Sequence, residues 1–245
     1  MAKIDLSKYG ITGTTEVVYN PSYEMLFEEE TKPELEGYEK GQESELGAVN
    51  VMTGVYTGRS PKDKFIVDTP SVHDDIAWGS VNVPITQEKF NAIRSKVIAY
   101  LQNREIFIFD GMAGADPVCT RKFRIINELA SQNLFIHELL IRPTAEELEN
   151  YGEADFTIFV APGFKCIPEI DGTHSEAAII VDYEQKQVVI CGSQYSGEIK
   201  KSVFSVMNFL MPKEGVLPMH CSANMDPETH ETAVFFGLSG TGKTT

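Results

Sequence analysis

Hydrophobic residues along the chain recur with two spacings, one typical of helices and one typical of strands. In residues 86–102 they repeat every three or four positions, which predicts an amphipathic helix capped by Thr86. A capping-box pattern from Thr144 to Glu147 predicts a shorter helix. Further helices are predicted by the same spacing at the start of 23–46, over 120–131 and over 196–211.

Short runs of β-branched and aromatic residues predict strands between these helices. The predicted strands are residues 16–19, 46–56, 64–67, 106–109, 134–141, 155–160, 177–183, 188–191, 216–220 and 232–236. A polar turn at 184–187 joins the strands on either side of it into a hairpin. Because helices and strands alternate, the chain is predicted to be an α/β protein.

Residues 212–215 combine proline and glycine between a predicted helix and a predicted strand, which indicates a linker. The expected organisation is therefore an N-terminal, mixed-sheet α/β domain over residues 1–214. The opening strands and phosphate-binding loop of a nucleotide-binding domain follow over residues 215–245.

A phosphate-binding loop motif (P-loop) ends the chain. Residues 237–244 fit G-x-x-x-x-G-K-[ST] and follow the predicted strand 232–236. Its glycines let backbone N–H groups close on a phosphate chain, Lys243 can reach the β- and γ-phosphates, and the Thr244 hydroxyl can bind a divalent metal. A P-loop needs the helix that follows it, and the sequence stops at Thr245, so we expect this chain to be the first part of a longer protein.

The net charge restricts the partners that such a loop can serve. The 245 residues carry a formal net charge of −15, and 42% of them are hydrophobic. The composition is ordinary for a globular protein, whereas the charge argues against nucleic acid or an anionic membrane as a partner. A site for nucleotides or carboxylate substrates must therefore be a local cluster of positive charge.

The four cysteines are widely separated and form no C-x-x-C pair, which predicts reduced core cysteines of a cytosolic protein and no zinc cluster. They are Cys119, Cys166, Cys191 and Cys221. No apolar signal segment begins the chain, and its longest apolar stretch, around 203–211, is too short to span a bilayer. We therefore expect a cytoplasmic protein without membrane contact.

Three further segments suit anions or metals, and each has an ordinary structural alternative. Arg59 lies in a loop, 57–64, with two lysines, where it can clamp a carboxylate or belong to a basic surface turn. Lys200 and Lys201 follow a glycine at a predicted helix N-terminus, which suits an anion site or two solvated lysines. His220 ends a predicted strand shortly before the P-loop, where it faces the same phosphates or is a core or surface residue.

Together these segments resemble the ATP-dependent phosphoenolpyruvate carboxykinases over most of the chain. The resemblance is carried by residues 19–23, 53–63, 141–143, 195–201, 207–208, 219–224 and 235–245. The P-loop with Leu-Ser-Gly-Thr at its centre is more specific than the general motif. One departure is Ser196 before Gly197, since family members usually have two glycines here; Ser196 can still cap the helix, so we expect the change to be tolerated.

The resemblance implies a carboxy-lyase of gluconeogenesis that converts oxaloacetate and ATP to phosphoenolpyruvate, CO₂ and ADP. It assigns Arg59 to the substrate carboxylate and CO₂, and it assigns Tyr195 to a position beside the substrate. Lys201 would contact substrate and, with His220, bind Mn²⁺. A lysine binds a metal only when neutral, so the metal and the cationic neighbours Lys200 and Arg59 are expected to lower its pKa.

The P-loop residues have corresponding roles by the same resemblance. Lys243 is catalytic, Ser239 and Lys243 contact phosphates, and Thr244 binds the Mg²⁺ that accompanies ATP. The implied nucleotide-binding residues are Gly237, Leu238, Ser239, Gly240, Thr241, Gly242, Lys243, Thr244 and Thr245. Family members are longer, so the chain is expected to be roughly their first half and to need the C-terminal half as a partner for activity.

Two other functions are compatible with parts of the sequence. One is a non-catalytic module that binds small anions or partner proteins. The other is an unrelated P-loop kinase of small molecules, which would leave the segments around Arg59, Lys201 and His220 unexplained.

Overall fold

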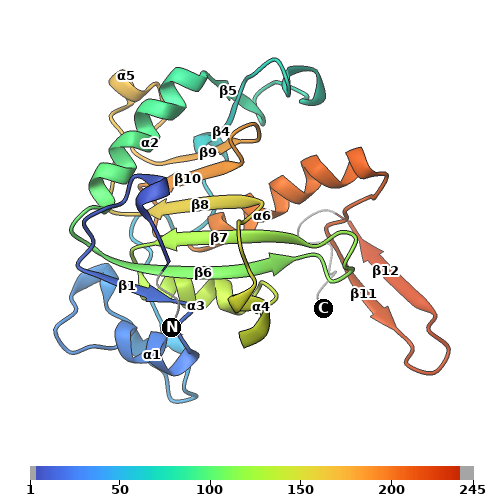
Figure 1. The fold of residues 1–245 in the computed structure, drawn as a ribbon, viewed down its shortest axis with the longest axis horizontal. Coiled ribbons are helices and arrows are strands. Elements are labelled where there is room, and N and C mark those ends of the chain that lie inside the picture. The colour runs from blue at the N-terminus through green and yellow to red at the C-terminus, as the bar shows by residue number, and fades with distance from the viewer. Residues whose placement is uncertain (1–3, 238–245) are drawn as a thin grey trace. The chain divides into compact units, whose positions relative to one another are not determined.

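The computed structural model describes residues 4–237. Its main element is an eight-stranded sheet in the order β1-β6-β7-β8-β10-β9-β4-β5 (Figure 1). The strands are β1 (Glu16–Tyr19), β4 (Lys64–Val67), β5 (Val83–Ile85), β6 (Glu105–Ala113), β7 (Arg121–Asn127), β8 (Phe156–Ala161), β9 (Ala178–Asp182) and β10 (Gln187–Cys191). The pairs β6–β7 and β10–β9 are antiparallel and the other pairs are parallel, which confirms a mixed-sheet α/β fold.

Helices cover both faces of the sheet (Figure 1). The helices of the described residues are α1 (Tyr23–Glu30), α2 (Gln87–Leu101), α3 (Ala130–His137), α4 (Ala145–Glu149), α5 (Pro168–Asp171) and α6 (Gly197–Leu210), of which α2 and α3 pack directly on the sheet. Side chains alternate along a strand, so Ile106 and Ile108 of β6 belong to the core cluster that includes the buried face of α2. Phe107, between them, packs with Leu26 of α1 and Ala130 of α3.

Local sequence signals placed several of these elements correctly. The Thr86 hydroxyl accepts the N–H of Lys89 at 3.3 Å and caps α2, as predicted. Thr144 and Glu147 form the predicted capping box at α4. The predicted hairpin is the antiparallel pair β9–β10. In each case the signal lies within a few neighbouring residues, so distant parts of the chain do not alter it.

The helix predicted over 120–131 is wrong, because residues Arg121–Asn127 form strand β7. The strand lies inside the sheet between β6 and β8, and residues 123–127 are all buried. A strand that is buried on both faces has no alternation of polar and apolar residues, so a short apolar run can also be read with helical spacing.

The strand predicted over 134–141 is also wrong, since α3 covers Ala130–His137. Its buried side chains include Ala130, Asn133 and His137, which recur at helical spacing. Two of these three side chains are polar, so a search for apolar residues missed the pattern.

Two further predicted strands are absent or much shorter. Of residues 46–56 only Val49–Asn50 is a strand, β3, which pairs with β2 (Gln42–Glu43). Gly47 and Gly54 adopt positive φ angles of 80° and 63°, which interrupt an extended backbone. Residues 216–220 form no strand, because proline at 218 cannot donate a ladder hydrogen bond, and β11 (Cys221–Met225) begins after them.

The chain divides into two compact units, Met1–Val203 and Phe204–Thr245. The eight-stranded sheet belongs to the first unit. In the second, β11 and β12 (Thr232–Phe236) form an antiparallel hairpin in which Phe236 is 73% exposed. The predicted domain boundary between residues 214 and 215 stays a prediction. None of the helices within residues 4–237 has the length and apolar character needed to cross a membrane.

Candidate functional site

The register of the sheet brings two of the predicted anion-binding segments to the same end of β4 and β10, which lie on either side of β9. Lys64, the first residue of β4, pairs with Ile179 of β9, and Ile179 pairs with Ile190 near the end of β10. The segment before β4 is the Arg59 loop, residues 57–63, and the segment after β10 leads into α6. The loop that enters β4 and the segment that follows β10 therefore lie at the same end of the sheet's strands.

Glu198, in the first turn of α6, connects this helix to the Arg59 loop. Its side chain is fully buried, and its Oε1 accepts the backbone N–H of Ser60 at 2.7 Å. Its Oε2 lies 3.9 Å from Nζ of Lys64 and has no hydrogen-bond partner among the described residues. Because an unpaired buried charge is costly, these two contacts favour one position of the loop against the helix.

A second set of contacts fixes the end of the Arg59 loop nearest β4. Asp63 is buried, and its Oδ1 accepts the Ser175 hydroxyl at 2.8 Å. The Tyr56 hydroxyl lies 3.3 Å from the same Ser175 oxygen. The loop is thus held at Ser60 and on both sides of it, whereas Arg59 itself is exposed.

Four positive side chains influence one another at this end of the sheet's strands. Burial lowers the pKa of Lys201, and the charges of Arg59 and Lys200 lower it further. Lys64 adds to this effect and Glu198 opposes it. Burial also lowers the pKa of Lys64; the charge of Glu198 opposes this effect and that of Arg59 adds to it.

Tyr195 lies two residues before the first residue of α6 and is half-buried. Its N–H donates to the Ser193 hydroxyl at 3.3 Å. A Cβ atom built on Gly197 would lie 2.4 Å from Cε1 of the Tyr195 ring, so only glycine leaves room for the ring in this position.

The remaining predicted site residues belong to the second unit or lie outside the described residues. His220 is exposed and precedes β11, so the prediction that it ends a strand is wrong; its ring lies 5.5 Å from that of Phe204. Gly237 is the last described residue, so the other P-loop residues, 238–245, are outside the described range. Within residues 4–237 no group of three or more His, Cys, Asp or Glu side chains is arranged to hold a metal ion.

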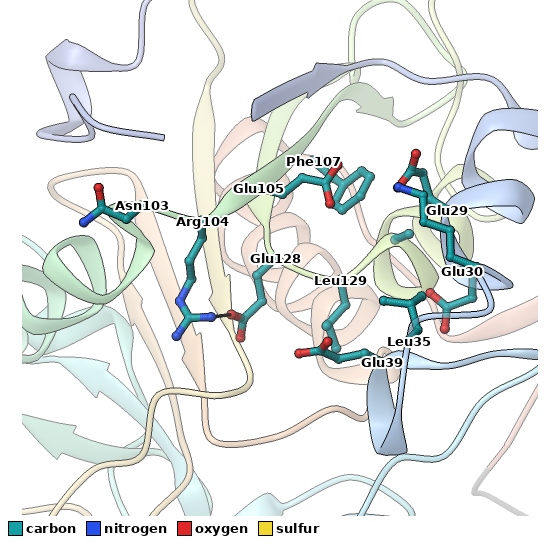
Figure 2. Close-up of a pocket in the computed structure, with 12 residues that line it drawn as sticks. Glu29, Glu30, Leu35, Glu39, Asn103, Arg104, Glu105, Phe107, Glu128 and Leu129 are labelled. Atoms are coloured by element: carbon teal, nitrogen blue, oxygen red, sulfur yellow. Dashed lines mark hydrogen bonds and ion pairs between the residues drawn. The ribbon is translucent and has the colours of Figure 1, made fainter. Parts of the chain in front are cut away.

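A pocket of ≈ 230 Å³ elsewhere in the first unit has the opposite charge (Figure 2). Its lining includes five glutamates, one lysine and one arginine, and shares no residue with the cluster around Arg59. Figure 2 shows Arg104 beside Glu128. Nη1 of Arg104 lies 3.7 Å from Oε2 of Glu128. Glu30 is 1% exposed, and burial raises its pKa to about 7. This lining repels anions, so the pocket does not suit an anionic substrate.

Sequence reasoning missed two residues of the cluster, Lys64 and Glu198. Lys64 opens a strand and was grouped with a basic turn, and Glu198 is one acidic residue in the first turn of a helix. Their roles depend on contacts between residues 138 positions apart, as in the bond from Ser60 to Glu198. A buried carboxylate between two basic segments could not be inferred without the pairing of β4, β9 and β10.

An α/β protein with an arginine and three lysines gathered beside the N-terminus of a helix has the features of a protein that binds small anions. Comparison with known families gives a more specific result. The family described as phosphoenolpyruvate carboxykinase, in its ATP-dependent form, matches residues 15–245. The chain therefore belongs to the ATP-dependent phosphoenolpyruvate carboxykinase family.

Curated relatives agree with this assignment. A phosphoenolpyruvate carboxykinase (ATP) of Fusobacterium nucleatum is 62% identical over 240 residues, which are 98% of this chain and 44% of the relative. The protein of the same name from Caldanaerobacter subterraneus is 52% identical over 242 residues, which are 99% of this chain and 45% of the relative. Phosphoenolpyruvate carboxykinase (ATP) 1 of Moorella thermoacetica is 59% identical over 199 residues, 81% of this chain and 38% of the relative. The chain thus spans less than half the length of these relatives.

Proposed function

We propose that this chain acts within a longer enzyme that converts oxaloacetate and ATP to phosphoenolpyruvate, CO₂ and ADP. The observation that carries the proposal is the cluster of Arg59, Lys64, Lys200 and Lys201 in a chain of this family with a net charge of −15. Oxaloacetate and ATP are both anions, and such a cluster attracts them within a negative field. The reaction would serve gluconeogenesis in the cytoplasm.

Three residues of the cluster are proposed to bind the organic substrate. The planar guanidinium of Arg59 donates two parallel hydrogen bonds to a carboxylate of oxaloacetate and remains beside the CO₂ that leaves. Tyr195 lies beside the substrate, and Lys201 contacts the substrate as the same neutral amine that is proposed to bind Mn²⁺. Loss of CO₂ leaves an enolate, so positive groups that are already in position lower the barrier.

The nucleotide is proposed to bind to the P-loop, residues 237–245. Backbone N–H groups of this loop and the Lys243 ammonium neutralise the phosphates, which favours attack of the enolate on the γ-phosphate. In phosphoryl transfer of this kind, positioning and charge neutralisation account for most of the catalysis.

Two metal ions are proposed, Mn²⁺ held by Lys201 and His220 and Mg²⁺ held by Thr244 with ATP. The fit can be judged at Lys201, where burial and the charges of Arg59 and Lys200 lower the pKa and so favour the neutral amine that a metal requires. A bound divalent cation supplies charge neutralisation for the enolate and the phosphates. The C-terminal half of the protein is proposed to contribute the remaining ligands.

The experiment compares the complete natural protein with the 245-residue chain. With oxaloacetate, ATP, Mg²⁺ and Mn²⁺, the complete protein should form phosphoenolpyruvate and ADP in equal amounts, and formation should stop when ATP is omitted. The 245-residue chain alone should show no turnover. Anion binding without product by the complete protein would favour a non-catalytic module, and phosphorylation of a different small molecule would favour a kinase; either result would refute the proposal.

A further inference from the structure

The Arg59 side chain is exposed, although its proposed role needs a fixed position. Its neighbour Ser60 is buried. The backbone on either side of Arg59 belongs to a loop that follows no strand ladder, since β4 begins only at Lys64. A misplacement of about 1 Å in a binding residue can cost about a hundredfold in rate, so the support of this loop matters for catalysis.

We propose that Glu198 is the positioning residue that holds the Arg59 loop against the start of α6, with the Ser60 N–H as its point of attachment. The contact is buried, 2.7 Å long, and joins the residue after Arg59 to the turn of α6 that carries Lys200 and Lys201. One carboxylate thus determines the spacing between the arginine on one segment and the lysines on the other.

The second carboxylate oxygen of Glu198 lies among the positive side chains of the cluster. Oε2 lies 3.9 Å from Lys64 Nζ and accepts no hydrogen bond from the described residues. Its negative charge therefore reduces the mutual repulsion of Lys64, Arg59 and the two lysines of α6. Because it is fully buried, Glu198 does not reach the solvent from which substrate enters, so it acts through Ser60 and Lys64.

Other contacts of the loop do not substitute for this one. The contacts among Tyr56, Ser175 and Asp63 attach the loop to the segment before β9. They do not include α6. Without Glu198, the Arg59 loop and the helix bearing Lys201 would keep their separate positions on the sheet and lose the bond that joins them.

The test uses the complete natural protein and three variants, and it rests on the proposed function for its kinetic part. Glu198→Ala removes both contacts and leaves the buried Ser60 N–H unpaired, so the KM for oxaloacetate should rise about tenfold while the KM for ATP stays within about twofold. Glu198→Gln keeps an oxygen that can accept the Ser60 N–H, so its KM for oxaloacetate should be close to that of the natural protein. Glu198→Asp keeps the charge but is one methylene shorter, so its KM for oxaloacetate should rise, as in Glu198→Ala.

Hydrogen exchange supplies a readout that does not depend on activity. Exchange in the peptide covering residues 57–64 should be faster in Glu198→Ala and Glu198→Asp than in the natural protein, and close to natural in Glu198→Gln. Glu153→Ala is the matched control, because it removes a glutamate whose pair with Lys8 is at the surface, and it should change neither exchange in 57–64 nor either KM.

The outcomes separate the two proposals. A complete protein that makes no phosphoenolpyruvate refutes the proposed function, and the exchange pattern still tests the role of Glu198. An active protein in which Glu198→Ala leaves the oxaloacetate KM and the exchange of 57–64 unchanged refutes the positioning role. An equal rise in KM for oxaloacetate and for ATP, together with faster hydrogen exchange throughout the first unit, would show a general structural role. That result would also refute the positioning role of Glu198.

Discussion

Asp110 and Arg124 face each other across β6 and β7 and form two parallel hydrogen bonds inside the sheet. Arg124 Nε donates to Oδ1 at 2.7 Å, and Nη2 donates to Oδ2 at 2.6 Å. Both side chains are at least 95% buried, and the Tyr19 hydroxyl also donates to Asp110, at 2.8 Å. The pair favours the observed antiparallel register of β6 and β7, because a shift of one residue would separate the two charges.

Arg124→Met is expected to destabilise the fold strongly. The substitution leaves the Asp110 carboxylate buried without its partner, and breaking a buried ion pair on one side costs about 3–5 kcal/mol. Urea unfolding, followed by circular dichroism, should show a much lower midpoint. Glu153→Ala is the control, because its pair with Lys8 joins side chains that are 81% and 34% exposed and should contribute at most about 1 kcal/mol. Equal shifts for the two variants would contradict the prediction.

The same pair shows what the sequence could and could not predict. Signals confined to neighbouring residues, such as the Thr86 cap and the β9–β10 turn, identified their elements correctly. The segment holding Arg124 was predicted to be helical, because nothing local reveals that Asp110 lies opposite it on another strand. For the same reason Arg59 and Lys201 could be proposed from sequence, whereas Glu198, whose role depends on Ser60, could not.

Gly192→Ala is expected to disturb the segment that leads from β10 to Tyr195. Gly192 has φ +72°, and a Cβ atom there would lie 2.5 Å from the backbone oxygen of Glu176, so both strain and collision oppose the substitution. Gly152 is the matched control, since it has φ +67° but nothing within 4 Å of an added Cβ. Gly152→Ala should cost about 1 kcal/mol from backbone strain alone, and Gly192→Ala clearly more. Comparison of urea midpoints measures the difference, and a larger loss for Gly152→Ala would contradict the explanation.

Glu30→Gln is expected to change how stability depends on pH. Burial raises the pKa of Glu30 from 4.5 to about 7, so between these values the folded protein holds a proton that the unfolded chain has released. Stability from this group is therefore complete below pH 4.5 and is lost as the pH rises to about 7. The glutamine variant has no such loss, and its stability relative to the natural protein should increase by about 3 kcal/mol from pH 4.5 to pH 7.

The control for Glu30→Gln is Glu28→Gln, which removes an exposed carboxylate from the same helix. The glutamine introduced at position 30 can still accept the Ser131 N–H that Glu30 Oε2 accepts at 2.7 Å, so the variant isolates the effect of charge. Urea midpoints at pH 4.5 and pH 7 would measure both variants. If Glu28→Gln changed the pH profile as much as Glu30→Gln, burial of Glu30 would not be the cause.

Lys201→Ala in the complete natural protein is expected to lower the rate of phosphoenolpyruvate formation by at least about a thousandfold, because the proposed site loses both a substrate contact and a metal ligand. The control is Lys186→Ala, which removes an exposed lysine from the β9–β10 turn and should leave the rate unchanged. Folding can be checked by circular dichroism, since Lys201 makes no part of the buried face formed by Ile199 and Val203. Rates of product formation with saturating oxaloacetate, ATP, Mg²⁺ and Mn²⁺ provide the measurement. A Lys201→Ala protein with near-natural activity would remove this residue from the site, and the lowered pKa of its ammonium would then reflect only burial among Arg59, Lys200 and Lys64.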